Sequence, residues 1–207
     1  MFHVKHLISS ALERAAIHQG LSSGVEIDLV KLEAYLGLLT KWNKKIDLVA
    51  PCGVEDLIQR HLQDSFAAYL LIRKEVAAFK SCLDVGTGAG LPGIIFAILE
   101  PDVVFHLCEP REKRQIFLRE VVESLGLENV ELLRARLEEL EGEYDLICSR
   151  ALGIQEQFLS HSRQLLAKNG SICQLLGPSW SGQADKVVDY SLEVGGPSRK
   201  LAIWFYK

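Results

Sequence analysis

Residues 81–93 read SCLDVGTGAGLPG, and this stretch decides the fold. Its apolar start at 82–85 is typical of a strand, and the glycines that follow at alternate positions allow positive φ and let a ligand approach bare backbone. Pro92 suits the first turn of a helix, where its missing N–H is not needed. The stretch therefore predicts a strand, a glycine turn and a helix, with a nucleotide-like cofactor at the carboxyl end of the strand. The residues expected to meet that cofactor are Asp84, Gly86, Gly88 and Gly90.

The glycine spacing alone leaves the cofactor open. Gly88, Gly90 and Gly93 fit the bare dinucleotide pattern G-x-G-x-x-G, and a purely structural turn is another interpretation. A P-loop is excluded, because Ile94 stands where a lysine would have to follow the last glycine. Asp84 would repel a pyrophosphate but would attract the sulfonium and ammonium of S-adenosylmethionine. The order acidic-x-G-x-G-x-G resembles motif I of the S-adenosylmethionine methyltransferases, and S-adenosyl-L-methionine is the cofactor we expect.

Later strands are expected to bring further candidates to the same edge of the sheet, because the carboxyl ends of parallel strands lie together. The second strand-like run ends at Glu109, whose carboxylate can accept both ribose hydroxyls of an adenosine. The alternative is a surface glutamate at a helix start, which is mildly favourable there. Leu137 and Glu138 follow the third strand, where an adenine edge would lie, and Arg150 ends the fourth.

Alternation of strands and helices from residue 81 predicts an α/β fold with a doubly wound, mostly parallel, seven-stranded sheet covered on both faces. Residues 1–75 are expected to form a helical N-terminal extension, with helices over 25–45 and 54–71. Residues 76–207 would form the S-adenosylmethionine-dependent methyltransferase domain in one compact unit. The expected strands are 82–85, 103–108, 130–133, 144–149, 171–176 and an antiparallel pair at 190–194 and 201–206; the expected helices are 91–99, 111–125 and 154–168.

Composition agrees with one α/β domain and a modest extension: the chain has 207 residues, of which 48% are hydrophobic and 24% charged. There is no apolar stretch long enough to span a bilayer, and no signal-peptide pattern at the start. The five cysteines form no C-x-x-C pair, so neither a metal site nor a redox pair is suggested. We expect a cytoplasmic monomer. Residues 1–6 show no evident helical stripe and are expected to contribute little to the enzyme.

Four stretches resemble the RsmG family, also called glucose-inhibited division protein B. They are the glycine loop at 84–93, the W-N-K segment at 42–44, RHLQDS at 60–65 and ICSRA at 147–151. Members of this family methylate ring nitrogen 7 of one guanine in the 530 loop of 16S ribosomal RNA. The resemblance implies that activity here, with 16S rRNA in the 30S subunit or its precursor as partner. It also implies that the cofactor pocket is lined by Gly86, Leu91, Leu137, Glu138 and Arg150.

The chemistry of that reaction agrees with the residues present. Ring nitrogen 7 has an in-plane lone pair and no proton, so methyl transfer to it needs orientation rather than a general base. Arg150 is the candidate catalytic residue, because it could donate to guanine O6 or pair with the cofactor carboxylate; a buried structural ion pair is the alternative. Near the strand tips, the basic residues that could contact RNA are Arg60, His61 and Arg199.

The charge of the chain and one departure from the family pattern bear on the substrate. The formal net charge of −4 is unlike that of a general nucleic-acid binder and suggests a small phosphate footprint on a preassembled particle. The family has a lysine before the glycine that follows the fifth strand, whereas this chain has Leu176 before Gly177. A small-molecule methyltransferase of the same fold, or a non-catalytic descendant that binds RNA or cofactor, therefore stays open.

Overall fold

The computed structural model describes residues 2–21, 26–150 and 155–206. Its strands are β1 (Ser81–Val85), β2 (Val104–Cys108), β3 (Val130–Leu133), β4 (Tyr144–Arg150), β5 (Leu166–Leu176), β6 (Lys186–Tyr190) and β7 (Arg199–Phe205). Its helices are α1 (Phe2–His18), α2 (Leu29–Asn43), α3 (Val54–Asp56), the π-helix η1 (Leu57–Leu62), α4 (Gln63–Glu75), α5 (Gly93–Leu99), α6 (Glu112–Leu125), the 3-10 turn η2 (Leu137–Glu139) and α7 (Gln155–Gln164).

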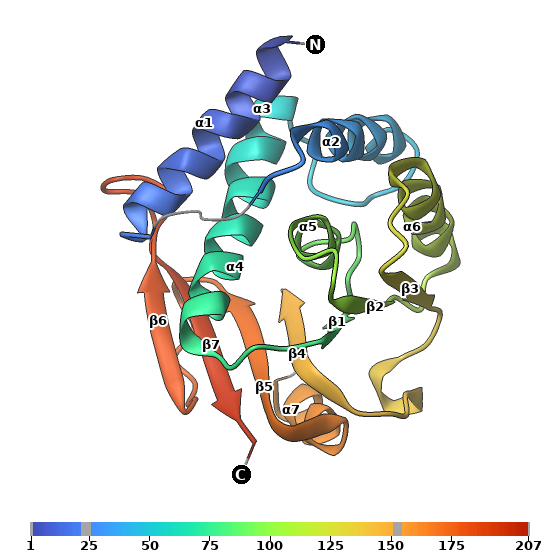
Figure 1. Ribbon diagram of the computed structural model, residues 1–207, viewed down its shortest axis with the longest axis vertical. Helices are drawn as coiled ribbons and strands as arrows, with labels where there is room; N and C mark the ends of the chain where they lie inside the picture. The colour runs from blue at the N-terminus through green and yellow to red at the C-terminus, as the bar shows by residue number, and fades with distance from the viewer. Residues whose placement is uncertain (1, 22–25, 151–154, 207) are drawn as a thin grey trace.

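In the described residues these strands form one seven-stranded sheet in the order β3-β2-β1-β4-β5-β7-β6 (Figure 1). The first five strands in that order run parallel, and β7 lies antiparallel between β5 and β6. Val85 is in register with Cys108 on one side and Ser149 on the other, so the strands end at the same edge. The predicted α/β architecture and the antiparallel closing pair are confirmed.

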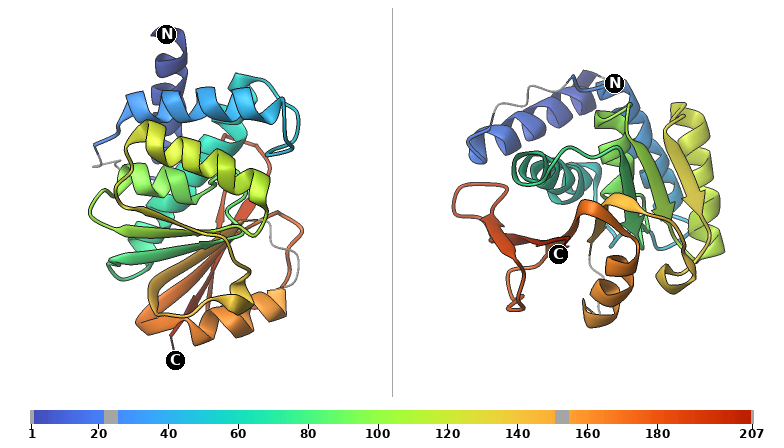
Figure 2. Two further views of the ribbon diagram at one scale, coloured as in Figure 1. Left: turned by 90° about the vertical axis from the view of Figure 1, so that its right-hand side faces the viewer. Right: turned by 60° about the horizontal axis from the view of Figure 1, so that its bottom comes forward.

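Helices cover both faces of the sheet (Figure 2). The two faces follow from strict alternation along β1, where side chains point up and down in turn. Cys82 belongs to the core under α4, α5 and α6, whereas Leu83 and Val85 belong to the core shared with Phe158 of α7. This alternation also places Asp84 on the α5 side, beneath the start of that helix.

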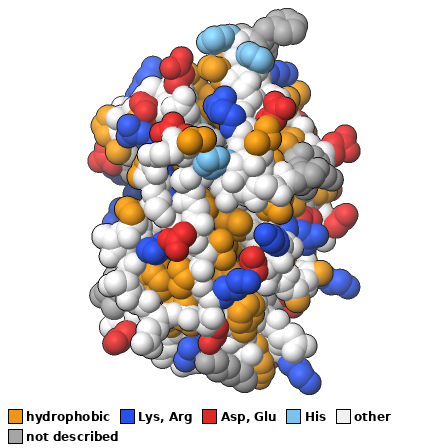
Figure 3. Space-filling view, turned by 90° about the vertical axis from the view of Figure 1, so that its left-hand side faces the viewer, with side chains coloured by type: hydrophobic (Ala, Val, Ile, Leu, Met, Phe, Trp, Pro, Cys, Tyr) orange, Lys and Arg blue, Asp and Glu red, His pale blue; other side chains and the backbone are white. Residues whose placement is uncertain are grey.

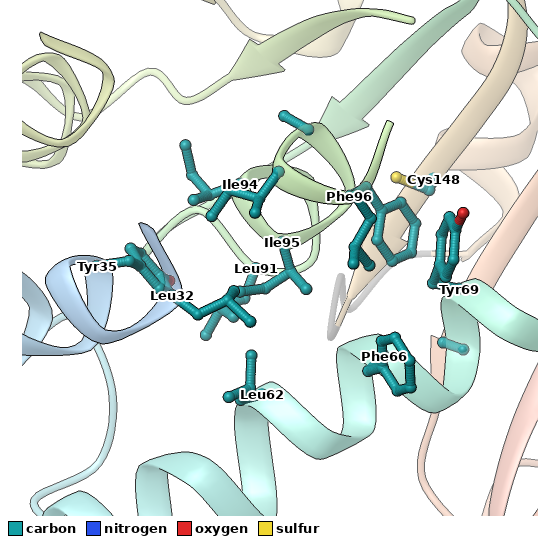
Figure 4. Close-up of a cluster of buried hydrophobic side chains, with 14 of the residues drawn as sticks. Leu32, Tyr35, Leu62, Phe66, Tyr69, Leu91, Ile94, Ile95, Phe96 and Cys148 are labelled. Carbon is teal, nitrogen blue, oxygen red and sulfur yellow. The ribbon is translucent and has the colours of Figure 1, made fainter. Parts of the chain in front are cut away.

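The N-terminal helices share a hydrophobic core with the helix that follows the glycine loop (Figure 4). Tyr35 of α2 and Phe66 of α4 are fully buried with Ile94 of α5. The Tyr35 hydroxyl donates to the Ala89 carbonyl oxygen at 2.7 Å, which ties α2 directly to the glycine loop. The helical region ends at Glu75, close to the expected limit, while a domain boundary there stays a prediction.

Two sequence predictions at the C-terminal side were wrong in position. The strand expected at 190–194 lies at 186–190, because β6 is an edge strand with mostly exposed side chains and carries little alternation in its sequence. The helix expected to end at residue 168 ends at Gln164, and β5 begins at Leu166. The apolar pair at 165 and 166 fits either element, since a short apolar run does not separate helix from strand.

Residues 1–6 have no evident helical stripe, yet α1 begins at Phe2, within the helical extension that the sequence predicts. Val4 packs against the core, and Lys5 pairs with Glu33 of α2 at 3.7 Å. The helix is held by these tertiary contacts rather than by a strong local pattern. In the described parts of the chain, none of the helices is long and apolar enough to cross a membrane.

Candidate functional site

The glycine loop leaves β1 through three left-handed positions, with φ of +69° at Gly86, +59° at Gly88 and +85° at Gly90. The loop is anchored to the neighbouring strand, since the backbone N–H groups of Gly86 and Thr87 donate to the Cys108 carbonyl oxygen. A Cβ on Gly90 would lie 2.4 Å from Ile94 Cγ1, so this glycine is required by helix packing. Gly86 and Gly88 instead line a cavity at the edge of the sheet.

Asp84 lies beneath the loop and is fully buried. Its Oδ2 accepts a hydrogen bond from Thr87 Oγ1 at 2.6 Å and from the Gly93 N–H at 2.9 Å. Burial raises the pKa of this carboxyl to about 6, and the hydrogen bonds oppose the shift only in part. Its observed contacts hold the loop against the start of α5, and direct contact with a cofactor stays a prediction.

A first cavity of about 540 Å³ and a second of about 560 Å³ lie on either side of the glycine loop and share Gly86 and Pro110. The first is mainly apolar and reaches Phe158 of α7. The second is more polar. Of the predicted cofactor residues, Leu137 and Glu138 line the first cavity, Gly88, Leu91, Glu109 and Arg150 line the second, and Gly86 lines both; Asp84 and Gly90 line neither.

Glu109 is only 3% exposed and lies in the wall of the second cavity. One carboxylate oxygen accepts from the Arg111 N–H at 2.9 Å, and the other lies 3.4 Å from Arg114 Nη1. Arg114 also donates to the Asp47 carbonyl oxygen at 3.1 Å, which links the carboxylate to the loop after α2. Sequence reasoning missed Arg114, because nothing in the helix pattern distinguishes it from the other basic residues of α6.

The loop that follows the W-N-K segment also lines the second cavity. Asn43 Oδ1 accepts from the N–H groups of Leu48 and Val49 at 3.0 and 2.9 Å. These bonds hold the following loop in place, and Leu48, Val49 and Ala50 line the cavity. The role of Asn43 is thus to shape the wall.

Arg150 lies at the centre of a buried ionic cluster. Its Nε is 3.5 Å from Asp64 Oδ2, and Arg199 Nη1 is 3.3 Å from the same oxygen. The Tyr190 hydroxyl donates to Asp64 Oδ1 at 2.8 Å. Asp64 is 2% exposed, and these three groups are the partners of its buried carboxylate. The structure therefore brings together Arg150, Arg199 and His61, whereas Arg60 pairs separately with Asp56 at 3.2 Å.

Besides its ion pair with Asp64, Arg150 faces the second cavity and, among the described residues, keeps a hydrogen-bond donor without a partner. It lines the second cavity, and its Nη1 is buried without a hydrogen-bond partner in the described part of the chain. Asp64 was part of the RHLQDS stretch, yet its role as the common partner had no signal in the sequence. Leu176, at the position of the family lysine, lines a small cavity of about 250 Å³ beside Arg150 and Arg199, which supply positive charge there.

His61 is neutral at pH 7. Arg150 Nη2 lies 2.8 Å from His61 Nδ1, and because a guanidinium has only donors, Nδ1 accepts and the proton is on Nε2. Burial, together with the positive charge of Arg150, lowers the pKa of this imidazole to about 4. A neutral ring so placed holds Arg150 in position.

Acidification is expected to destabilise the fold through His61. Between the unfolded pKa of 6.5 and the folded pKa of about 4, the unfolded chain binds a proton that the folded chain does not. Stability is therefore lost as the pH falls through that window. Denaturant titrations at pH 7, 6 and 5 should show that the free energy of unfolding falls less with pH in His61→Gln than in the wild type. His3→Gln is the control, because His3 is exposed. The same dependence on pH in the wild type and in His61→Gln would contradict this prediction.

Residues 28–187 match the family described as GidB, rRNA small subunit methyltransferase G. A protein of Francisella philomiragia named ribosomal RNA small subunit methyltransferase G is 37% identical over 184 residues, covering 86% of this chain and 87% of its own length. One of the same name from Halorhodospira halophila is 38% identical over 157 residues, covering 74% and 73%.

Solved structures share the fold at low identity. The METTL16 methyltransferase domain superposes with a TM-score of 0.56 at 19% identity, covering 98% of this chain and 92% of that one. The ribosomal protein L11 methylase of Lactobacillus delbrueckii subsp. bulgaricus gives 0.51 at 19% identity, covering 72% and 79%. Fold, glycine loop and sequence similarity over most of the chain agree, and the chain belongs to the rRNA small subunit methyltransferase G family.

Proposed function

We propose that this protein transfers a methyl group from S-adenosylmethionine to ring nitrogen 7 of a guanine in the 530 loop of 16S rRNA. The single observation that carries the proposal is the pair of cavities that share Gly86 in their linings, with Glu109 and Arg150 lining the second. Family membership supports an rRNA acceptor. Such a substrate also supports a cytoplasmic site of action on the 30S subunit or its precursor, and we propose that the protein acts there as a monomer.

The cavities fit the proposed cofactor by shape and charge. The apolar first cavity suits an adenine between Leu137 and Phe158, and Glu109 is placed to accept the ribose hydroxyls. Gly88 has no side chain to occupy the second cavity, where a Cβ would approach Arg114 Nη1 to 3.3 Å. When bound, S-adenosylmethionine supplies an electrophilic methyl group on a sulfonium.

The residues beside Arg150 support an acceptor that needs no general base. His61 has a pKa of about 4 and already accepts from Arg150, so it holds the guanidinium rather than removing a proton. The free donor on Arg150 can orient guanine through O6, or hold the cofactor carboxylate. Correct orientation of nitrogen 7 towards the methyl group supplies most of the rate effect.

The proposal is tested by two measurements in sequence. Calorimetric titration with S-adenosylmethionine and with NADH should give binding to the first only. Methyl transfer from labelled cofactor to undermethylated 30S particles should then occur at one guanine, mapped by cleavage at the modified base. Transfer to small metabolites but not to 30S particles would favour a small-molecule methyltransferase. Cofactor binding without any transfer would favour a non-catalytic descendant, which the loss of the family lysine at Leu176 keeps open.

Glu109→Ala is expected to weaken cofactor binding by about 1.5–3 kcal/mol, because the variant no longer offers the ribose a charged hydrogen-bond acceptor. The dissociation constant measured by calorimetry should rise about tenfold to 150-fold. Glu112→Ala is the matched control, since Glu112 lies three residues further along the chain, is exposed at the start of α6 and pairs with Arg134. Equal affinities for the two variants would remove Glu109 from the cofactor site.

A further inference from the structure

A third cavity, of about 750 Å³, lies away from the glycine loop, between α1, η1 and the loop that joins β6 to β7. Its basic lining comes from three separate elements: Arg14 of α1, Arg60 of η1 and Arg199 of β7. Leu7 and Leu192 supply apolar surface. Segments far apart in the chain therefore converge on one basic hollow that the proposed methyl-transfer site does not include.

The walls of this cavity are held by hydrogen bonds that do not depend on a ligand. Gln63 Nε2 donates to the Leu192 carbonyl oxygen at 2.8 Å, and Gln19 Nε2 donates to the Ser191 carbonyl oxygen at 3.0 Å. These bonds fasten the β6–β7 loop to α4 and to the chain just after α1. The arginines are thus presented on a preformed surface.

Positive charge in the cavity is only partly neutralised. Arg60 pairs with Asp56, and Arg199 pairs with the buried Asp64 but keeps a buried Nε without a partner. Within the described ranges Arg14 makes no ion pair. Glu193 is the other acidic residue of the lining. The free guanidinium donors match the oxygens of a phosphate, which accepts several N–H groups at once.

The third cavity is linked to the proposed methyl-transfer site by arginines that line neighbouring cavities. Arg199 lines both the third cavity and the small cavity beside Leu176, and Arg150 lines that small cavity and the second cavity. A run of guanidinium groups therefore leads from the glycine loop to α1. The π-helix η1 contributes to both ends, since Arg60 faces the third cavity and the adjacent His61 faces the second.

We propose that the third cavity binds backbone phosphates of the RNA strand that carries the target base, with α1 as its outer wall. The proposal rests on the proposed function, in which this strand enters at Arg150. The molecule has a formal net charge of −4, and on the side that shows α1 and β6 basic side chains are interspersed with acidic ones (Figure 3). Phosphate binding is therefore concentrated in a few contacts at this cavity, as suits recognition of a folded RNA by shape.

The test compares Arg14→Ala with Arg119→Ala. Both arginines are exposed on helices and make no ion pair in the described part of the chain, but Arg119 lies on α6, away from the third cavity. Arg14→Ala is expected to raise KM for 30S particles about threefold to tenfold with kcat unchanged, as expected when one charged hydrogen bond to a phosphate is removed. The slope of log affinity against log salt should fall by about 0.7–0.9. Arg14→Lys should recover most of the affinity, and Arg119→Ala should match the wild type.

Equal KM and salt slopes for Arg14→Ala and Arg119→Ala would overturn the inference. Binding of 30S particles, measured by filter retention without cofactor, distinguishes a failure of the third-cavity proposal from a failure of the proposed function. A wild-type protein that binds particles but does not methylate them refutes the proposed function, and the comparison of the two variants still tests the cavity. A wild-type protein that does not bind particles overturns both. Thermal unfolding of each variant confirms that the comparison is made between folded proteins.

Discussion

Gly88→Val is expected to abolish binding of S-adenosylmethionine, because it fills the site and strains the loop together. Gly88 has φ of +59°, a conformation that a β-branched residue rarely adopts. An added Cβ would meet Arg114 Nη1 at 3.3 Å, and the rest of the valine would extend into the second cavity. Calorimetry at cofactor concentrations up to the millimolar range should detect no binding.

The control for backbone strain is Gly126→Val. Gly126 ends α6 with φ of +58°, nearly the same as Gly88, and an added Cβ there meets nothing within 4 Å. Both variants should lose stability by roughly 1–2 kcal/mol from the left-handed conformation, but only Gly88→Val should lose the cofactor. If Gly88→Val bound the cofactor as well as Gly126→Val, the ligand would not approach the loop at this point.

Arg150→Ala is expected to lower kcat about a hundredfold or more, since a misplacement of the reacting groups by about 1 Å has an effect of that size. The fold should persist, with a melting temperature within a few degrees of the wild type. The reason is that Asp64 keeps two partners, Arg199 at 3.3 Å and Tyr190 at 2.8 Å. Single-turnover methylation of 30S particles at saturating cofactor measures the effect.

Two further variants separate orientation from packing. Arg150→Lys keeps the positive charge but not the planar fork of donors, and should recover stability more than activity. Asp64→Ala removes the common partner and leaves two largely buried arginines unpaired, so it should destabilise the fold far more than Arg150→Ala. A large loss of stability in Arg150→Ala with unchanged activity per folded molecule would assign Arg150 a purely structural role.

The central strands were predictable because their signal is local. Each is a short apolar run beside a helix, and residues 82–85 and 103–108 were placed within a residue of β1 and β2. The edge strand β6 was misplaced, because most of its side chains are exposed and it lacks the alternation that burial imposes. The other edge strand, β3, is largely half-buried and was placed correctly at 130–133. The first turn of α1 shows no helical stripe for a related reason: contacts with α2 and the core stabilise it.

The conformation of the loop at 84–93 could be predicted from its own residues, since glycine adopts positive φ without a tertiary partner. The same stretch therefore predicted a cofactor edge and most of the residues that line it. It could not tell that Asp84 lies under the loop, or that Gly90 packs against Ile94 rather than lining a cavity, because both depend on how α5 packs against β1.

The alternation of strands and helices and the glycine turn follow from periodicity and backbone preference, which neighbouring residues set among themselves. The surroundings of Arg150 do not follow from such local preferences. His61 and Arg150 are 89 residues apart in the chain, and they meet with Asp64 only because α4 packs across the tips of β4 and β7. Pairing of charges over such separations is decided by the packing of whole elements, since burial of the intervening apolar side chains, rather than any local preference, brings the partners within reach.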